Sequence, residues 1–92
     1  MDPVDRLNQP LTSKSAAINL AADTDFTVNS HGLYPFARRI FVGTGGDVVA
    51  RKIRDSGYTT YKAASGTYLD GAWAIVRSTG NGTTASNLVA EQ

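Results

Sequence analysis

The stretch ARRIFVGTGGDVVARKI, from Ala37 to Ile53, decides the class of fold that this sequence favours. Its two halves are rich in β-branched residues, which favour strands, and they flank the glycine-rich turn Thr44–Gly46. A phosphate-binding loop would need a helix directly after the glycines, because the free N–H groups of a helix N-terminus hold the anion. Two valines follow instead. The pattern predicts a β-hairpin with structural glycines, at least one of them with positive φ.

Short β-prone segments recur about every ten residues on both sides of this stretch. They lie at residues 17–23, 25–32, 58–64, 67–78 and 85–90, and turn signals separate them, including Asp55–Gly57 and Asp70–Gly71. Asp70–Gly71 is read as a turn between two strands, and the glycine-rich segment Thr79–Thr84 as a flexible turn. The sequence therefore predicts an all-β fold: a small antiparallel β-sandwich or barrel of six or seven short strands, forming a single β-domain over residues 16–92.

Residues 1–15 differ from the rest of the chain. They contain two prolines and show no sustained hydrophobic period, which predicts an extended N-terminal arm. One interpretation is a tail without contacts. The other is an arm that docks on a neighbouring chain through Val4, Leu7 and Leu11.

The expected core combines the apolar positions of these strands. It consists of Ile18, Leu20, Phe26, Ile40, Val42, Val48, Trp73, Ile75, Leu88 and Val89. Ile40 and Val42 point to one side of their strand and Phe41 to the other, while Val48 and Val49 give the next strand two apolar faces as well. Either a loop covers the second face, or that face is buried against other copies or another protein.

Composition excludes several classes of protein. The chain has 92 residues, a net charge of +1 and no cysteine, so it has room for one core and forms no disulfide or thiolate metal site. The longest apolar run is far shorter than a membrane-spanning helix, and the acidic N-terminus is unlike a signal peptide. His31 is the only histidine and has no evident partners, so we expect no catalytic, metal or cofactor site and no enzyme activity.

A basic and aromatic strip suggests an alternative function, the binding of single-stranded nucleic acid by a small β-barrel. Its candidate residues are Arg38, Arg39, Arg51, Lys52, Arg54, Tyr58, Tyr61 and Tyr68. The competing interpretation is a pair of solvated strand faces with charge contacts to Asp47 and Asp55, which the near-neutral total charge favours.

Two longer stretches together resemble a family of very small phage-type proteins. The first is ARRIFVGTGGDVVARK, and the second is AASGTYLDGAWAIVRSTGNGTTASNLVA. The shared pattern is an arginine-aromatic-valine-glycine strand, a glycine-rich turn with aspartate, a later glycine and a terminal arginine, threonine and glycine segment. The family includes the head spike base proteins of gene transfer agents and related tailed phages. This chain departs from it by an inserted Asn81-Gly82 and a longer arm.

The resemblance implies a virion structural protein without catalysis, metal or cofactor. Several copies, most simply a pentamer, would form a ring on a capsid vertex and hold a spike fibre on the particle head, after assembly in the bacterial cytoplasm. The expected partners are other copies of the chain, the major capsid protein and the fibre protein, with no membrane or nucleic acid. A closed ring needs two different patches on each subunit. The candidates for these patches are Val4, Leu7, Leu11, Arg38, Ile40, Phe41 and Val49.

Overall fold

The structure, a computed structural model, describes residues 14–28 and 32–92. Its strands are β1 (Ser15–Ala17), β2 (Thr24–Asp25), β3 (Ala37–Thr44), β4 (Gly46–Lys52), β5 (Thr59–Ala63), β6 (Thr67–Val76) and β7 (Ser86–Glu91). A short 3-10 helix, η2 (Thr79–Asn81), lies between β6 and β7. The prediction of an all-β fold is confirmed, and every strand pair in the described residues is antiparallel.

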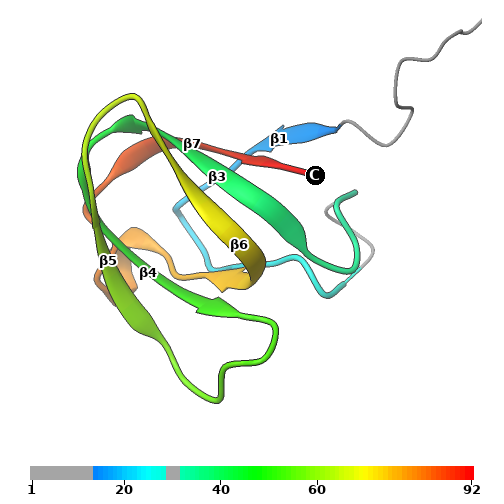
Figure 1. The fold of residues 1–92 in the computed structure, drawn as a ribbon. Helices are drawn as coiled ribbons and strands as arrows, with labels where there is room; N and C mark the ends of the chain where they lie inside the picture. The colour runs from blue at the N-terminus through cyan, green and yellow to red at the C-terminus, as the bar shows by residue number, and fades with distance from the viewer. Residues whose placement is uncertain (1–13, 29–31) are drawn as a thin grey trace, which may run out of the picture.

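One sheet holds all seven strands, in the order β1-β7-β3-β6-β4-β5, with β2 paired to the end of β6. Residues Thr67 to Trp73 of β6 pair with β3, and residues Trp73 to Val76 pair with β4. Figure 1 shows β6 bending between these two parts. Because of this bend, residues of β3 and β7 pack against residues of β4 in one core, although β4 pairs with neither strand.

The predicted hairpin within Ala37–Ile53 is wrong. Only Gly45 separates β3 from β4, yet β3 lies between β7 and β6, whereas β4 lies between β6 and β5. The chain turns a corner here, and the glycines permit a close approach of backbones: a Cβ on Gly45 would lie 2.7 Å from the carbonyl oxygen of Ala63. Gly46 has a φ of 157°, so the expected positive φ is confirmed.

The Asp70–Gly71 pair does not form the turn that the sequence predicts, because it lies inside β6. Two residues separate Asp70 from Trp73 on β6, whereas one residue separates their partners on β3, which is a β-bulge. Gly71 has a φ of 154°, and the indole Nε1 of Trp73 donates a hydrogen bond of 2.8 Å to the carbonyl oxygen of Leu69. The turn signal thus marks a bend in one long strand.

The core contains most of the residues that the sequence predicts for it. Ile18, Phe26, Ile40, Val42, Val48, Trp73 and Leu88 are all buried. Leu20, Ile75 and Val89 are only partly buried. The alternation of buried residues along β3 and β7 confirms that each of these strands directs one side into the core and the other side away from it.

The sheet begins at Ser15, one residue before the predicted start of the β-domain. The backbone N–H of Gln92 donates to the carbonyl oxygen of Lys14 at 2.9 Å, which ties the last residue of the chain to the start of β1. Residues 1–13 of the predicted arm lie outside the described residues, and so does His31.

Candidate docking surface

The strands β1, β7, β3 and β6 lie side by side and share one outward side, which we call the outer face. Ile40 and Val42 are fully buried, so Phe41 between them points outward. Directly paired residues of antiparallel strands share a face. The register therefore defines two rows across the four strands. The apolar row is Ala17, Val89, Phe41 and Tyr68, and the charged row is Ser15, Glu91, Arg39 and Asp70.

The apolar row remains open to solvent in a single copy. Ala17 and Tyr68 are exposed, the latter by 44%, and Val89 and Phe41 are partly exposed. The rings of Phe41 and Tyr68 make an edge-on contact with centroids 5.3 Å apart. Isolated apolar side chains are common on protein surfaces, whereas a contiguous apolar row across four strands is typical of an interaction surface for another protein or a ligand.

The charged row is organised around Arg39. Its Nε donates a hydrogen bond of 2.8 Å to Oε1 of Glu91, and its guanidinium lies 4.1 Å from the ring centroid of Tyr68. The hydrogen bond to Glu91 raises the pKa of Arg39 above its ordinary value. Arg39 therefore links the two rows and is already paired within its own chain.

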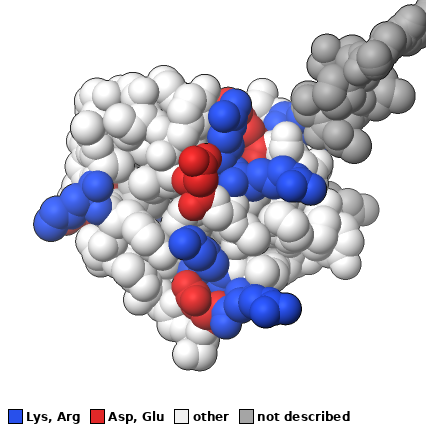
Figure 2. All heavy atoms as spheres, in the orientation of Figure 1, with Lys and Arg blue, Asp and Glu red and all other residues white. Residues whose placement is uncertain are grey.

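An open groove of about 530 Å³ lies along the charged row. Its lining residues are Lys14, Ser15, Arg38, Arg39, Asp70, Glu91 and Gln92. Figure 2 shows Lys and Arg side chains interleaved with Asp and Glu on this side of the molecule. Only Arg39 and Glu91 of this set pair with each other; Lys14, Arg38 and Asp70 form no ion pair with a described residue. The groove therefore offers two cations and one carboxylate that form no ion pair within the described residues.

The segment after η2 partly covers β4. The Thr83 side chain is fully buried, and its Oγ1 accepts a hydrogen bond of 3.1 Å from the N–H of Val49. A Cβ on Gly82 would lie 3.2 Å from the Val49 side chain. Of the two interpretations of the second apolar face, a partial cover by this segment fits β4, and both Val49 on β4 and Phe41 on β3 remain partly exposed.

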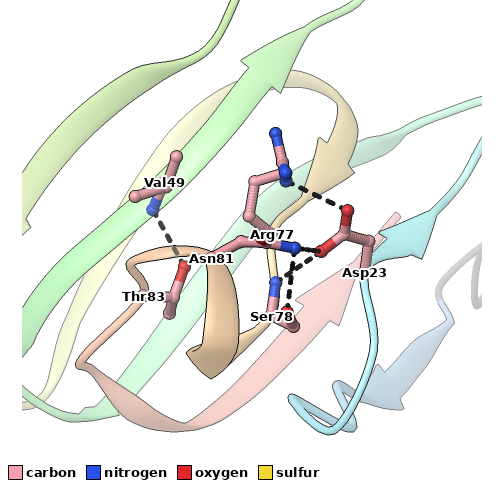
Figure 3. A network of polar contacts seen from close by, with 6 residues as sticks. All are labelled: Asp23, Val49, Arg77, Ser78, Asn81 and Thr83. Atoms are coloured by element: carbon pink, nitrogen blue, oxygen red, sulfur yellow. Dashed lines mark hydrogen bonds and ion pairs between the residues drawn. The ribbon is translucent and has the colours of Figure 1, made fainter.

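A polar network holds this covering segment in place (Figure 3). One carboxylate oxygen of Asp23 accepts hydrogen bonds from the backbone N–H of Ser78 at 2.7 Å and from Nδ2 of Asn81 at 3.0 Å. The other lies 3.0 Å from Nε of Arg77, in an ion pair whose angle does not suit a hydrogen bond. The bond from the Ser78 backbone, followed by that from Asn81, lowers the pKa of Asp23. The turn expected to be flexible is therefore braced at its start.

The interface candidates from the sequence fall into three groups. Phe41 lies on the outer face and Arg38 lines the groove. Ile40 is fully buried in the core, so it does not offer its side chain to a partner in the way the sequence suggests. Val49 is partly exposed and lies beside the segment after η2. Val4, Leu7 and Leu11 lie outside the described residues.

The basic residues of the nucleic-acid strip come from two strands that are not neighbours: Arg38 and Arg39 lie on β3, Arg51 and Lys52 lie on β4, and β6 separates these strands. Two of its tyrosine rings are already in contact with guanidinium groups of the same chain: Tyr68 with Arg39 at 4.1 Å, and Tyr58 with Arg77 at 4.4 Å. Lys52 lies 5.4 Å from the ring centroid of Trp73. Asp47 pairs at 3.2 Å with Lys62, which is not a member of the strip, and Arg51 donates a hydrogen bond of 2.9 Å to the backbone carbonyl oxygen of Asp55.

Sequence reasoning missed Val89 and Glu91 as members of the outer face and treated Tyr68 only as part of the nucleic-acid strip. The signal that would have found them is the register of β3 against β6 and β7, which no local pattern reveals. Asp23 and Arg77 were also missed as a pair, since they meet only after the sheet has formed.

Comparisons with protein-family models, with curated proteins and with solved structures found no match for this chain. Among residues 14–28 and 32–92, no three His, Cys, Asp or Glu side chains gather where they could hold a metal ion. The same residues contain no helix of the length and apolarity that crossing a membrane requires.

Proposed function

We propose that this chain is a structural protein of a phage-like particle, the head spike base, which sits on a capsid vertex and anchors a spike fibre. The observation that carries the proposal is the outer face. A subunit that functions by assembly needs an apolar surface that its own fold leaves open, and the apolar row supplies one on β1, β7, β3 and β6. The resemblance of the sequence motifs to head spike base proteins is the reason for proposing a phage-like particle.

A ring on a vertex adds a symmetry requirement. Five identical contacts around a fivefold axis close only if each subunit presents two different patches, one to each neighbour. The outer face is the first patch. The N-terminal segment, with Val4, Leu7 and Leu11, is the candidate for the second.

The test is to image particles from a producing strain with and without the gene, by electron cryomicroscopy and without imposed symmetry. We expect loss of the gene to remove both a fivefold base and the fibre above it from the vertices. Particles that keep complete spikes would contradict the proposal, as would a threefold or sixfold ring or copies bound away from the vertices.

A small β-barrel that binds single-stranded nucleic acid is the alternative from another functional class. The observation in its favour is that Lys14 and Arg38 line the groove without an ion pair to a described residue. Such binding would weaken steeply with salt, because each neutralised phosphate releases counterions. A gel-shift assay with single- and double-stranded DNA at low and moderate salt separates the two. Tight, salt-sensitive binding would reverse our preference.

A further inference from the structure

We propose that the outer face of one copy binds the N-terminal segment, residues 2–11, of a second copy. The chain would then associate by donating its segment to a neighbour and receiving another on its apolar row and groove. This proposal deepens the proposed function, since it states that the two patches of the ring bind each other. It is tested on the isolated protein, so its failure can be told apart from the failure of the role in a particle.

The chemistry of the segment complements that of the face. The sequence MDPVDRLNQPL alternates three apolar residues, Val4, Leu7 and Leu11, with two acidic residues and one arginine. The face offers an apolar row beside a groove with two cations, Lys14 and Arg38, that form no ion pair with a described residue. Apolar contacts would bind the segment, and the acidic side chains would fix its direction, because charge pairs at a rim contribute more to specificity than to affinity.

The lengths also agree. Neighbouring strands lie about 4.8 Å apart, so the row from β1 to β6 is roughly 14 Å wide. An extended chain advances about 3.3 Å per residue, so the stretch from Val4 to Leu11 spans roughly 23 Å. The apolar anchors of the segment can therefore cross the whole row. The residues between Leu11 and Ser15 remain to connect the two copies.

The direction of β1 favours a second copy over the chain's own segment. The strand runs from Ser15 in the charged row to Ala17 in the apolar row, so β1 begins at the end that is farther from the apolar row. To bind its own face, the segment would have to reverse its direction beside Lys14, over the groove itself. The segment of a neighbour can enter the same row without this reversal.

Cysteine cross-linking tests the pairing and the source of the segment together, since the natural chain has no cysteine. A Leu7→Cys chain mixed with a Tyr68→Cys chain should give a disulfide-linked dimer under mild oxidation. A mixture of Leu7→Cys with Tyr58→Cys is the control, because Tyr58 is exposed to a similar extent, 41% against 44%, and also contacts an arginine. Equal cross-linking in both mixtures would overturn the proposal.

The double variant Leu7→Cys/Tyr68→Cys, diluted before oxidation, distinguishes exchange between copies from binding within one chain. We expect a linked product only as the concentration of protein rises. A cross-linked monomer that forms at all dilutions would show that each segment binds its own face and would overturn the proposal.

Mixing a chain with a defective face and a chain with a defective segment tests the same pairing without cross-linking, through the measured association of the copies. Tyr68→Ser should weaken self-association by about 30-fold, as expected when an interface aromatic is lost, and Tyr58→Ser by no more than about twofold. A chain with serine at Val4, Leu7 and Leu11 should not self-associate, yet it should form a 1:1 dimer with Tyr68→Ser chains in native mass measurements, because one supplies the face and the other the segment. A wild-type chain that stays monomeric, or a mixture without this dimer, would refute the exchange. Native tryptophan emission in each variant confirms that it is folded.

Discussion

Replacing Gly45 by alanine tests the corner between β3 and β4, which distinguishes the observed fold from the hairpin. Gly45 does not have a positive φ, so alanine fits its backbone conformation. The obstacle is space: the added Cβ would lie 2.7 Å from the carbonyl oxygen of Ala63 and 2.8 Å from the N–H nitrogen of Ser65. Both are backbone atoms, one of the last residue of β5 and one of the segment that joins β5 to β6, so the backbone itself has to move.

The cost has two parts. A methyl group forced into a packed site costs about 1–3 kcal/mol. The movement also disturbs the 2.8 Å hydrogen bond from the N–H of Gly45 to Oγ of Ser65, and a lost hydrogen bond costs about 1 kcal/mol. We expect a loss of about 3 kcal/mol in the free energy of unfolding, which for a domain of this size lowers Tm by roughly 12–24 °C.

Thermal unfolding followed through the buried Trp73 measures the effect, with two alanine variants as controls. Gly66 has a φ of 79° and open space around its Cβ position, so Gly66→Ala should cost only about 1 kcal/mol, from backbone strain. Gly57 has neither a positive φ nor a close neighbour, so Gly57→Ala should change stability by no more than about 0.5 kcal/mol. If Gly45→Ala is no more destabilising than Gly57→Ala, the close approach at the corner does not exist.

Three further predictions concern side chains that stabilise the fold. Trp73→Ala should cost about 3–5 kcal/mol in chemical unfolding followed by circular dichroism, whereas Trp73→Phe, which loses the bond to Leu69 but keeps most of the packing, should cost less; equal losses would contradict the role of packing. Thr83→Val should cost about 1–3 kcal/mol because the buried N–H of Val49 loses its acceptor, and Thr83→Ser should restore most of this stability. The pKa of Asp23 in the folded protein is lowered from its ordinary value of 3.8, so the ionised side chain stabilises the fold above that pH, and this stabilisation is lost as the pH falls below it. Asp23→Asn should therefore reduce the fall of Tm on the acid side of a Tm-against-pH profile. An unchanged profile would show that the network contributes nothing to stability.

The sequence was sufficient for the fold class and much of the core, because both depend on local patterns. Alternation of apolar and polar residues correctly placed Ile40 inward and Phe41 outward. Pairing between strands was not predictable in the same way. The strands β3 and β4 are adjacent in the chain with glycines between them, which is the usual sign of a hairpin, yet β6 lies between them in the sheet. Glycines are needed here because β5 and β7 approach the backbone closely, Ala63 at Gly45 and Asn87 at Gly43. No local sequence pattern shows these approaches.

The partial prediction of the docking surface has the same physical cause. That Phe41 faces outward follows from alternation, but which side chains lie beside it follows from register, and a slip of one residue would turn a strand's whole set of side chains to the other face. The bulge in β6 sets this register: it gives the pair Asp70–Gly71 a place inside the strand, brings Asp70 opposite Arg39 and leaves Tyr68 opposite Phe41. Because Asp70–Gly71 was interpreted as a turn, the sequence did not predict Tyr68 in the apolar row or Asp70 in the charged row. The missed bend of β6 and the missed ends of the two rows thus have the same origin, the interpretation of Asp70–Gly71 as a turn. A variant that removes the bulge should therefore disturb both the bend of β6 and the outer face.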